Sequence, residues 1–391
     1  MKRSVLCAAF TLCCLAAAWA DEVAVTVKED RAPIADERND QGVVLFKRVL
    51  SIGNAGVRYQ QALDSKNGDK LVTQRYADYI LGCEFPRWSW NWDLQYFLDV
   101  TVTRPGGQPF IPNRAALQEG IYPLQQGARG VADMIWPLAG KDPTQAGRLA
   151  VRLVKPGDDP NWMFVRISLE GEPEAKITQV RMSSYPVITS GPPDRQRWVE
   201  TASRGLMMGG PPEKLDPATE WAVAMHNKYA NEEGGSLLVM DPTQIAAMSA
   251  QGTYPVNITM TPSSDRVVTV AMGYFWDTPW EKAVAAFKPQ MSERLQRLRN
   301  VDWTVPVDRS RWERERQEVA EILKLLPAEG PWQQRWALMQ ADGDKVLAEL
   351  GRPTPDPAAY RRFVLLMKEV GELKDQLYQP AIAALIDAAT K

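Results

Sequence analysis

The hydrophobic pattern changes once along the 391-residue chain, near residue 277. Before it, apolar residues alternate with polar ones in short runs that end at Gly, Pro, Asn or Asp, a pattern typical of β-strands joined by turns. After it, apolar residues recur every three or four positions, as in helices that bury one face. Such segregation indicates an α+β protein. We expect a large antiparallel two-sheet β-sandwich over residues 21–276 and a C-terminal α-helical region over residues 277–391.

Capping signals divide the helical region. The segments 278–281 (TPWE) and 310–313 (SRWE) both have the spacing of a capping box and predict helices to about Arg299 and Leu326. Pro331 and Pro357 are placed to open two more helices, because proline fits the first turn. By the same rule Pro380 predicts a separate, short last helix.

A tryptophan-rich stretch stands out in the β region. Trp88, Trp90 and Trp92 are followed by apolar residues at every second position to Val102. In an extended chain these side chains share one face, so the pattern predicts a long strand over residues 83–104 with a tryptophan row at its start. Two interpretations stay open. The row is part of the core, or it forms a platform on which sugar rings stack.

The first twenty residues indicate export. Lys2 and Arg3 precede a short apolar run, and residues 18–20 (AWA) form a small-x-small cleavage site, as in secretory signal peptides. That run is too short for a comfortable membrane span, and no later stretch reaches about 18 apolar residues. Three of the four cysteines lie in this segment, so only Cys83 remains and no intrachain disulfide can form. We expect a periplasmic or extracellular bacterial protein that is not an integral membrane protein.

Charge and motifs exclude several function classes. Loss of Lys2 and Arg3 takes the 46 basic residues to 44 against 48 acidic ones, a formal charge of −4, which gives no electrostatic case for nucleic acid. The single histidine, His226, excludes a multi-histidine zinc site and leaves one candidate for a Ser–His–Asp triad. Phosphate-binding glycine loops, H-E-x-x-H and G-x-S-x-G are absent from the sequence.

The segment 221–235 concentrates polar residues in a short connection between strands, which is the usual form of a binding site on a rigid scaffold. Its carboxylates suit acid–base chemistry with a histidine or tyrosine partner, and its Asn and Glu oxygens suit Ca²⁺. It also fits a plain solvated turn. The candidate catalytic residues are Glu232, Glu233, Tyr229 and His226. The candidate ligand-binding residues are Trp88, Trp90, Trp92, Arg87, Asp93, Asn227, Asn231, Tyr185 and Trp276.

A long antiparallel β region rich in Trp and Tyr, followed by helices, loosely resembles the galactose-mutarotase-like β-supersandwich superfamily over about residues 40–276. The resemblance implies a sugar-binding or sugar-processing protein. The paired histidines of the epimerases are absent, so no residue role is carried over.

Three hypotheses follow. The first is an exported carbohydrate-binding or carbohydrate-processing protein with a glycan in an aromatic-lined cleft. The second is an enzyme on this scaffold. A polysaccharide lyase would use Tyr185 or Tyr229 as base, whereas a glycoside hydrolase needs two carboxylates facing each other across a cleft. The third is a non-catalytic envelope or assembly protein whose helical region docks a partner. No cofactor other than Ca²⁺ is indicated.

Overall fold

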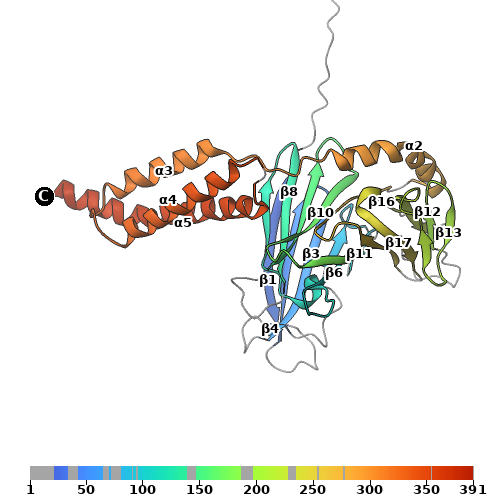
Figure 1. Ribbon diagram of the computed structural model, residues 1–391. Coiled ribbons are helices and arrows are strands. Elements are labelled where there is room, and N and C mark those ends of the chain that lie inside the picture. The colour runs from blue at the N-terminus through green and yellow to red at the C-terminus, as the bar shows by residue number, and fades with distance from the viewer. Residues whose placement is uncertain are drawn as a thin grey trace, which may run out of the picture.

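The computed structural model describes residues 22–33, 43–64, 70–71, 81–89, 91–93, 96–138, 147–185, 197–227, 235–252, 255–275, 278–353 and 355–390. Within these ranges the expected α+β organisation is confirmed. Strands lie between residues 25 and 274, and four long helices follow from residue 280 onward (Figure 1).

The described strands form three antiparallel sheets. The first has the order β1 (Val25–Pro33), β2 (Val43–Ile52), β3 (Ala55–Asp64) and β4 (Lys70–Leu71), with β5 (Leu81–Glu84) also paired to β3. The second has the order β13 (Gly205–Met207), β12 (Arg197–Glu200), β15 (Ala222–Asn227), β16 (Ser236–Met240), β19 (Val267–Tyr274), β10 (Trp162–Glu170), β9 (Arg148–Pro156), β8 (Arg129–Pro137) and β7 (Gly120–Gln125). The third has the order β14 (Glu213–Leu215), β17 (Ile245–Gln251), β18 (Val256–Pro262), β11 (Lys176–Ser184) and β6 (Leu98–Thr103). Two short helical segments, α1 (Pro112–Ala115) and η1 (Pro242–Gln244), connect strands.

The central strands of the nine-stranded sheet are buried on both faces. On β10, Val165 and Ile167 point into the main core, which the side chains of all three sheets form together. Phe164 points the other way, into a second core beneath helix α2 (Trp280–Arg299). Phe287 of α2 stacks on Trp162 there, with ring centroids 6.1 Å apart. Coverage on both sides explains why β10 reads as a nearly continuous apolar run.

The prediction of one long strand over residues 83–104 is wrong. Strand β5 ends at Glu84, residues 85–88 form a bend and turn, and β6 begins only at Leu98. Trp88 has a φ of 67°, in the left-handed region that reverses the chain direction. The alternation therefore does not place Trp88 and Trp92 on one face. Trp88 is 86% exposed, whereas Trp92 is fully buried between two sheets.

Helices α3 (Arg309–Leu323), α4 (Pro331–Leu350) and α5 (Pro357–Thr390) form an arm that projects from the sandwich (Figure 1). They share a third core, which includes Trp312, Trp336 and Leu366. Helix α5 has 34 residues, so it is about 51 Å long at about 1.5 Å per residue. It runs through Pro380, so the prediction of a separate last helix is wrong. No helix among the described residues is both long and apolar enough to cross a bilayer.

Candidate functional site

The exposed ring of Trp88 sits on an ordered turn. The backbone N–H of Arg87 donates to the carbonyl of Asn54 at 2.8 Å, and that of Ser89 donates to Pro86 at 3.1 Å. Phe85, at the start of the turn, is buried against Tyr274, with ring centroids 4.8 Å apart. The turn is thus fixed on both sides of the indole, while the indole itself projects into solvent.

Trp92 and Asp93 have structural contacts instead. The indole N–H of Trp92 donates to the carbonyl of Gly273 at 3.2 Å, which joins this segment to the nine-stranded sheet. The backbone of Trp92 also forms an antiparallel bridge with Ser184. Asp93 accepts a hydrogen bond from the backbone N–H of Tyr96 at 3.0 Å. The predicted tryptophan row is therefore not assembled on one surface by the described residues, since Trp92 belongs to the core.

His226 and Tyr185 lie toward opposite faces of the same sheet. His226 is buried, lies opposite Trp198 in the strand ladder and has its Nε2 atom 3.9 Å from Glu200. These residues point toward α2, because Lys288 of that helix lies 3.9 Å from the second Glu200 oxygen. Arg197 precedes Trp198 in β12, so its side chain points to the opposite face, toward the main core. Its guanidinium lies 5.7 Å from the ring centroid of Tyr185.

Asn227 lies opposite Arg197 in the ladder between β15 and β12, at the end of its strand. The other predicted residues lie outside the described ranges: Trp90, Tyr229, Asn231, Glu232, Glu233 and Trp276. The predicted Ca²⁺ site depends on the oxygens of that group. Among the described residues, no group of three or more His, Cys, Asp or Glu side chains is arranged to hold a metal ion.

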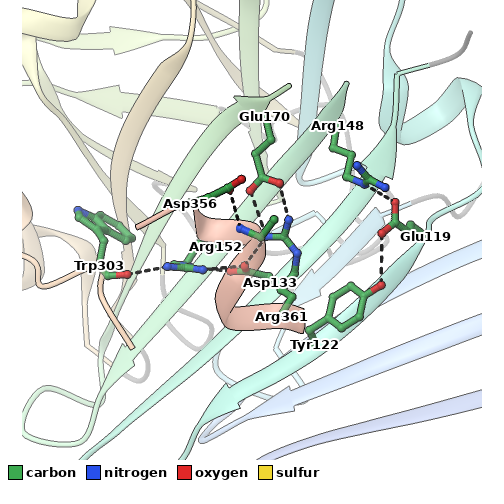
Figure 2. Close-up of polar contacts among 10 residues, drawn as sticks. Glu119, Tyr122, Asp133, Arg148, Arg152, Glu170, Trp303, Asp356 and Arg361 are labelled. Carbon is green, nitrogen blue, oxygen red and sulfur yellow. Dashed lines mark hydrogen bonds and ion pairs between the residues drawn. The ribbon is translucent and has the colours of Figure 1, made fainter. Parts of the chain in front are cut away.

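The sequence-based interpretation missed a buried ionic network where the arm meets the sandwich (Figure 2). Asp133 on β8 and Arg152 on β9 face each other in the ladder and form a two-pronged pair, with N–O distances of 2.7 and 2.8 Å. Arg361, in the first turns of α5, donates to Asp133 at 2.9 Å and to Glu170 of β10 at 3.0 Å. Four charged groups from four elements therefore meet in one buried place.

The network holds its charges through mutual pairing. Burial opposes the charge on Arg361, but hydrogen bonds and attraction from Glu170 and Asp133 outweigh it and raise the pKa of the guanidinium. Arg152 also donates to the carbonyl of Trp303, at 2.7 Å, in the segment between α2 and α3. The signal in the sequence was a charged residue inside each of three apolar strands, but alternation alone does not show that these residues meet.

A cavity of about 530 Å³ lies beside this network, in the angle between sandwich and arm. Its walls come from β7, the segment 305–308, the start of α3, and α5. The residues that line it are Pro123, Leu124, Val305, Pro306, Val307, Asp308, Arg311, Tyr360, Phe363, Val364, Met367 and Lys368. Its volume falls within the range typical of small-molecule sites, and such sites often lie between two parts of a protein.

No protein-family model matches the chain, and no curated protein matches it. Among solved structures, a match is a protein described as "Putative kojibiose phosphorylase from human microbiome", with 9% sequence identity and a TM-score of 0.34. The match covers 64% of this chain and 32% of that one, so this chain spans about a third of that protein's length. At this TM-score the likeness defines neither a fold nor an activity for this chain.

Proposed function

We propose that this is an exported carbohydrate-binding protein in which Trp88 supplies the stacking surface for a sugar ring. The observation that carries the proposal is the 86% exposure of an indole on a turn that is itself hydrogen-bonded to the sandwich. A flat aromatic face packs well against the apolar C–H face of a pyranose, and its N–H serves a hydroxyl group. The signal-like segment at residues 1–20 supports export.

Polar side chains for sugar hydroxyls are close to Trp88 in the sequence, at Glu84 and Arg87. The side chains of Glu84 and Arg87 lie together beside Gly56, each within 4.0 Å of the position that a Cβ on that glycine would take. A carboxylate accepts hydrogen bonds from hydroxyl groups and a guanidinium donates them, so both sugar hydroxyl roles are served. The ring contributes little to folding, because most of it stays in water.

The proposal concerns binding and not catalysis. The polysaccharide lyase and glycoside hydrolase alternatives depend on Tyr229, Glu232 and Glu233, for which the described residues provide no geometry. Tyr185 is buried close to Arg197, on the inner side of the nine-stranded sheet. A general base must lie within hydrogen-bonding reach of the proton that it removes. The exposed ring of Trp88 therefore supports binding of a sugar, and the described residues give no support for catalysis.

Affinity electrophoresis through gels that contain different polysaccharides tests the proposal. We expect at least one polysaccharide to retard the wild-type protein, and Trp88→Ala to weaken that interaction about fivefold, because one lost stacking contact is worth about 1 kcal/mol. Leu338→Ala is the matched control, since Leu338 is a large apolar residue that is 74% exposed on α4 of the arm. Equal retardation of Trp88→Ala and wild type, or no retardation in any gel, would refute the proposal.

The distal part of α5 favours a second candidate, a non-catalytic assembly protein with a helical docking region. Tyr378, Ile382, Leu385 and Ile386 are all exposed there, and steps of three, four and eight residues place them on one side of the helix. Such a stripe fits an amphipathic helix of a partner protein. Absence of any polysaccharide binding, with the fold intact, would favour this candidate over the first.

A further inference from the structure

The cavity between sandwich and arm has a composition of its own, independent of the proposed sugar surface. Most of the residues that line it are apolar, among them Leu124 from β7, Val305 from the connecting segment, and Phe363 and Met367 from α5. Val305, Phe363 and Met367 also belong to the buried cores on the two sides of the joint. An apolar ligand placed here would therefore touch both the sandwich and the arm.

Hydrogen bonds fix the walls before any ligand arrives. Arg129 of β8 donates to the carbonyls of Asp302 and Thr304, at 2.6 and 2.8 Å, and so ties the connecting segment to the sheet. Arg361 ties α5 to the same sheet two residues before Phe363. Because the cavity is preformed, a ligand would not have to order its own walls on binding.

The polar rim of the cavity favours an anion. Two cationic side chains, Arg311 and Lys368, line it together with one carboxylate, Asp308. That carboxylate caps α3, accepting hydrogen bonds from the Ser310 hydroxyl at 2.5 Å and from the Arg311 backbone at 3.0 Å. The hydrogen bond from Ser310 is the main reason that the pKa of Asp308 is lowered. Its charge therefore serves the helix end. Arg311 and Lys368 both line the rim, and Lys368 also lies 3.7 Å from Glu372 of the same helix, so a ligand carboxylate would share Lys368 with that side chain.

We propose that this cavity binds a small amphipathic monocarboxylate. The apolar body would lie among Leu124, Phe363 and Met367, and the carboxylate would lie at the rim between Arg311 and Lys368. An organic cation would meet like charge at that rim. A fully polar ligand would leave its hydroxyl groups unpaired against the apolar walls, which costs free energy. Because the walls come from both parts of the molecule, binding should also strengthen their attachment.

Isothermal titration calorimetry of the full-length protein with decanoate tests the proposal, with decanol as the neutral probe of the same chain length. We expect decanoate to bind at least tenfold more tightly than decanol. Arg311→Ala combined with Lys368→Ala should weaken decanoate binding about tenfold and leave decanol binding unchanged, because exposed charge pairs contribute up to about 1 kcal/mol each. Arg316→Ala combined with Lys324→Ala, on the same arm but away from the cavity, removes equal charge as the control.

Filling the cavity provides a second, independent measurement. Val364 lines it from α5, and Val364→Trp should abolish binding of both probes while circular dichroism shows the helices intact. If that variant does not fold, the double variant at the exposed residues Arg311 and Lys368 still tests whether the cavity binds the carboxylate. The proposal is overturned if decanoate does not bind, if the two double variants lose affinity equally, or if a folded Val364→Trp protein binds decanoate as well as the wild type does.

Discussion

At the scale of single residues, Glu220 shows how a buried carboxylate links stability to pH. Its two oxygens accept hydrogen bonds from Arg204 at 2.7 Å and from the backbone N–H of Asp216 at 2.9 Å. The hydrogen bond from Arg204 is the main cause that lowers the pKa of Glu220 to about 2, against an ordinary value of 4.5. As the pH falls, the unfolded chain therefore takes up a proton at Glu220 at a higher pH than the folded protein does.

Because the pKa of Glu220 is lower in the folded protein than in the unfolded chain, its ionised carboxylate stabilises the fold at pH values above about 4.5. This stabilisation is lost as the pH falls from about 4.5 toward 2. Glu220→Gln should cost about 2 kcal/mol of unfolding free energy at pH 7, a value reduced for solvent screening because the Arg204 side chain is 42% exposed. Urea unfolding at pH 7 and pH 3 should show the gap between variant and wild type narrowing at pH 3. Glu213→Gln, at an exposed position, is the control. A gap of equal size at both pH values would contradict this account.

At the scale of elements, alternation predicted the fold class but not where an alternating run is interrupted. The stretch 83–104 alternates well, yet Pro86 offers no backbone N–H for a ladder and Trp88 turns the chain. Helix ends were similarly displaced. Helix α3 is capped by Asp308 and not by Ser310, because the side chain of Asp308 accepts from the N–H of Arg311. The turn at Trp88 depends on a contact with a distant segment, because the backbone N–H of Arg87 donates to the carbonyl of Asn54. The same applies to the site residues, since alternation along β12 and β15 says nothing about which face α2 will cover.

Glycines in two helices of the arm should respond in opposite ways to alanine. A Cβ on Gly343 of α4 would lie 2.3 Å from the ring of Trp312, whereas one on Gly371 of α5 would have no neighbour within 4 Å. Alanine favours a helix by about 1 kcal/mol over glycine. We expect Gly371→Ala to raise the unfolding free energy by about 0.5 to 1 kcal/mol, and Gly343→Ala to lower it by about 1 to 3 kcal/mol through overpacking. Thermal melts followed at 222 nm measure both. Stabilisation by both variants would show that Trp312 moves aside freely.

At the scale of the whole molecule, one buried arginine, Arg361, joins the arm to the sandwich through ion pairs. The arm has a core of its own, which includes Trp312, Trp336 and Leu366. Its attachment to the sandwich combines the ion pairs of Arg361 with the hydrogen bonds and apolar contacts of residues 302–307. A buried pair that loses one partner leaves an uncompensated charge, which costs more than the pair contributes when intact.

Arg361→Met should therefore loosen the joint without unfolding the arm, because Glu170 loses its described ion-pair partner while Asp133 keeps Arg152. We expect a loss of about 3 kcal/mol in unfolding free energy, with unchanged helical circular dichroism and faster proteolysis in the segment 300–308. Arg362→Met is the matched control, since this neighbouring residue pairs with Asp342 and Glu369 within the arm. Its pairs are part-exposed, so its cost should stay below about 1 kcal/mol and the segment should remain protected. Equal proteolysis of the two variants would contradict this account. It would mean that the arm stays attached to the sandwich without the ion pairs of Arg361.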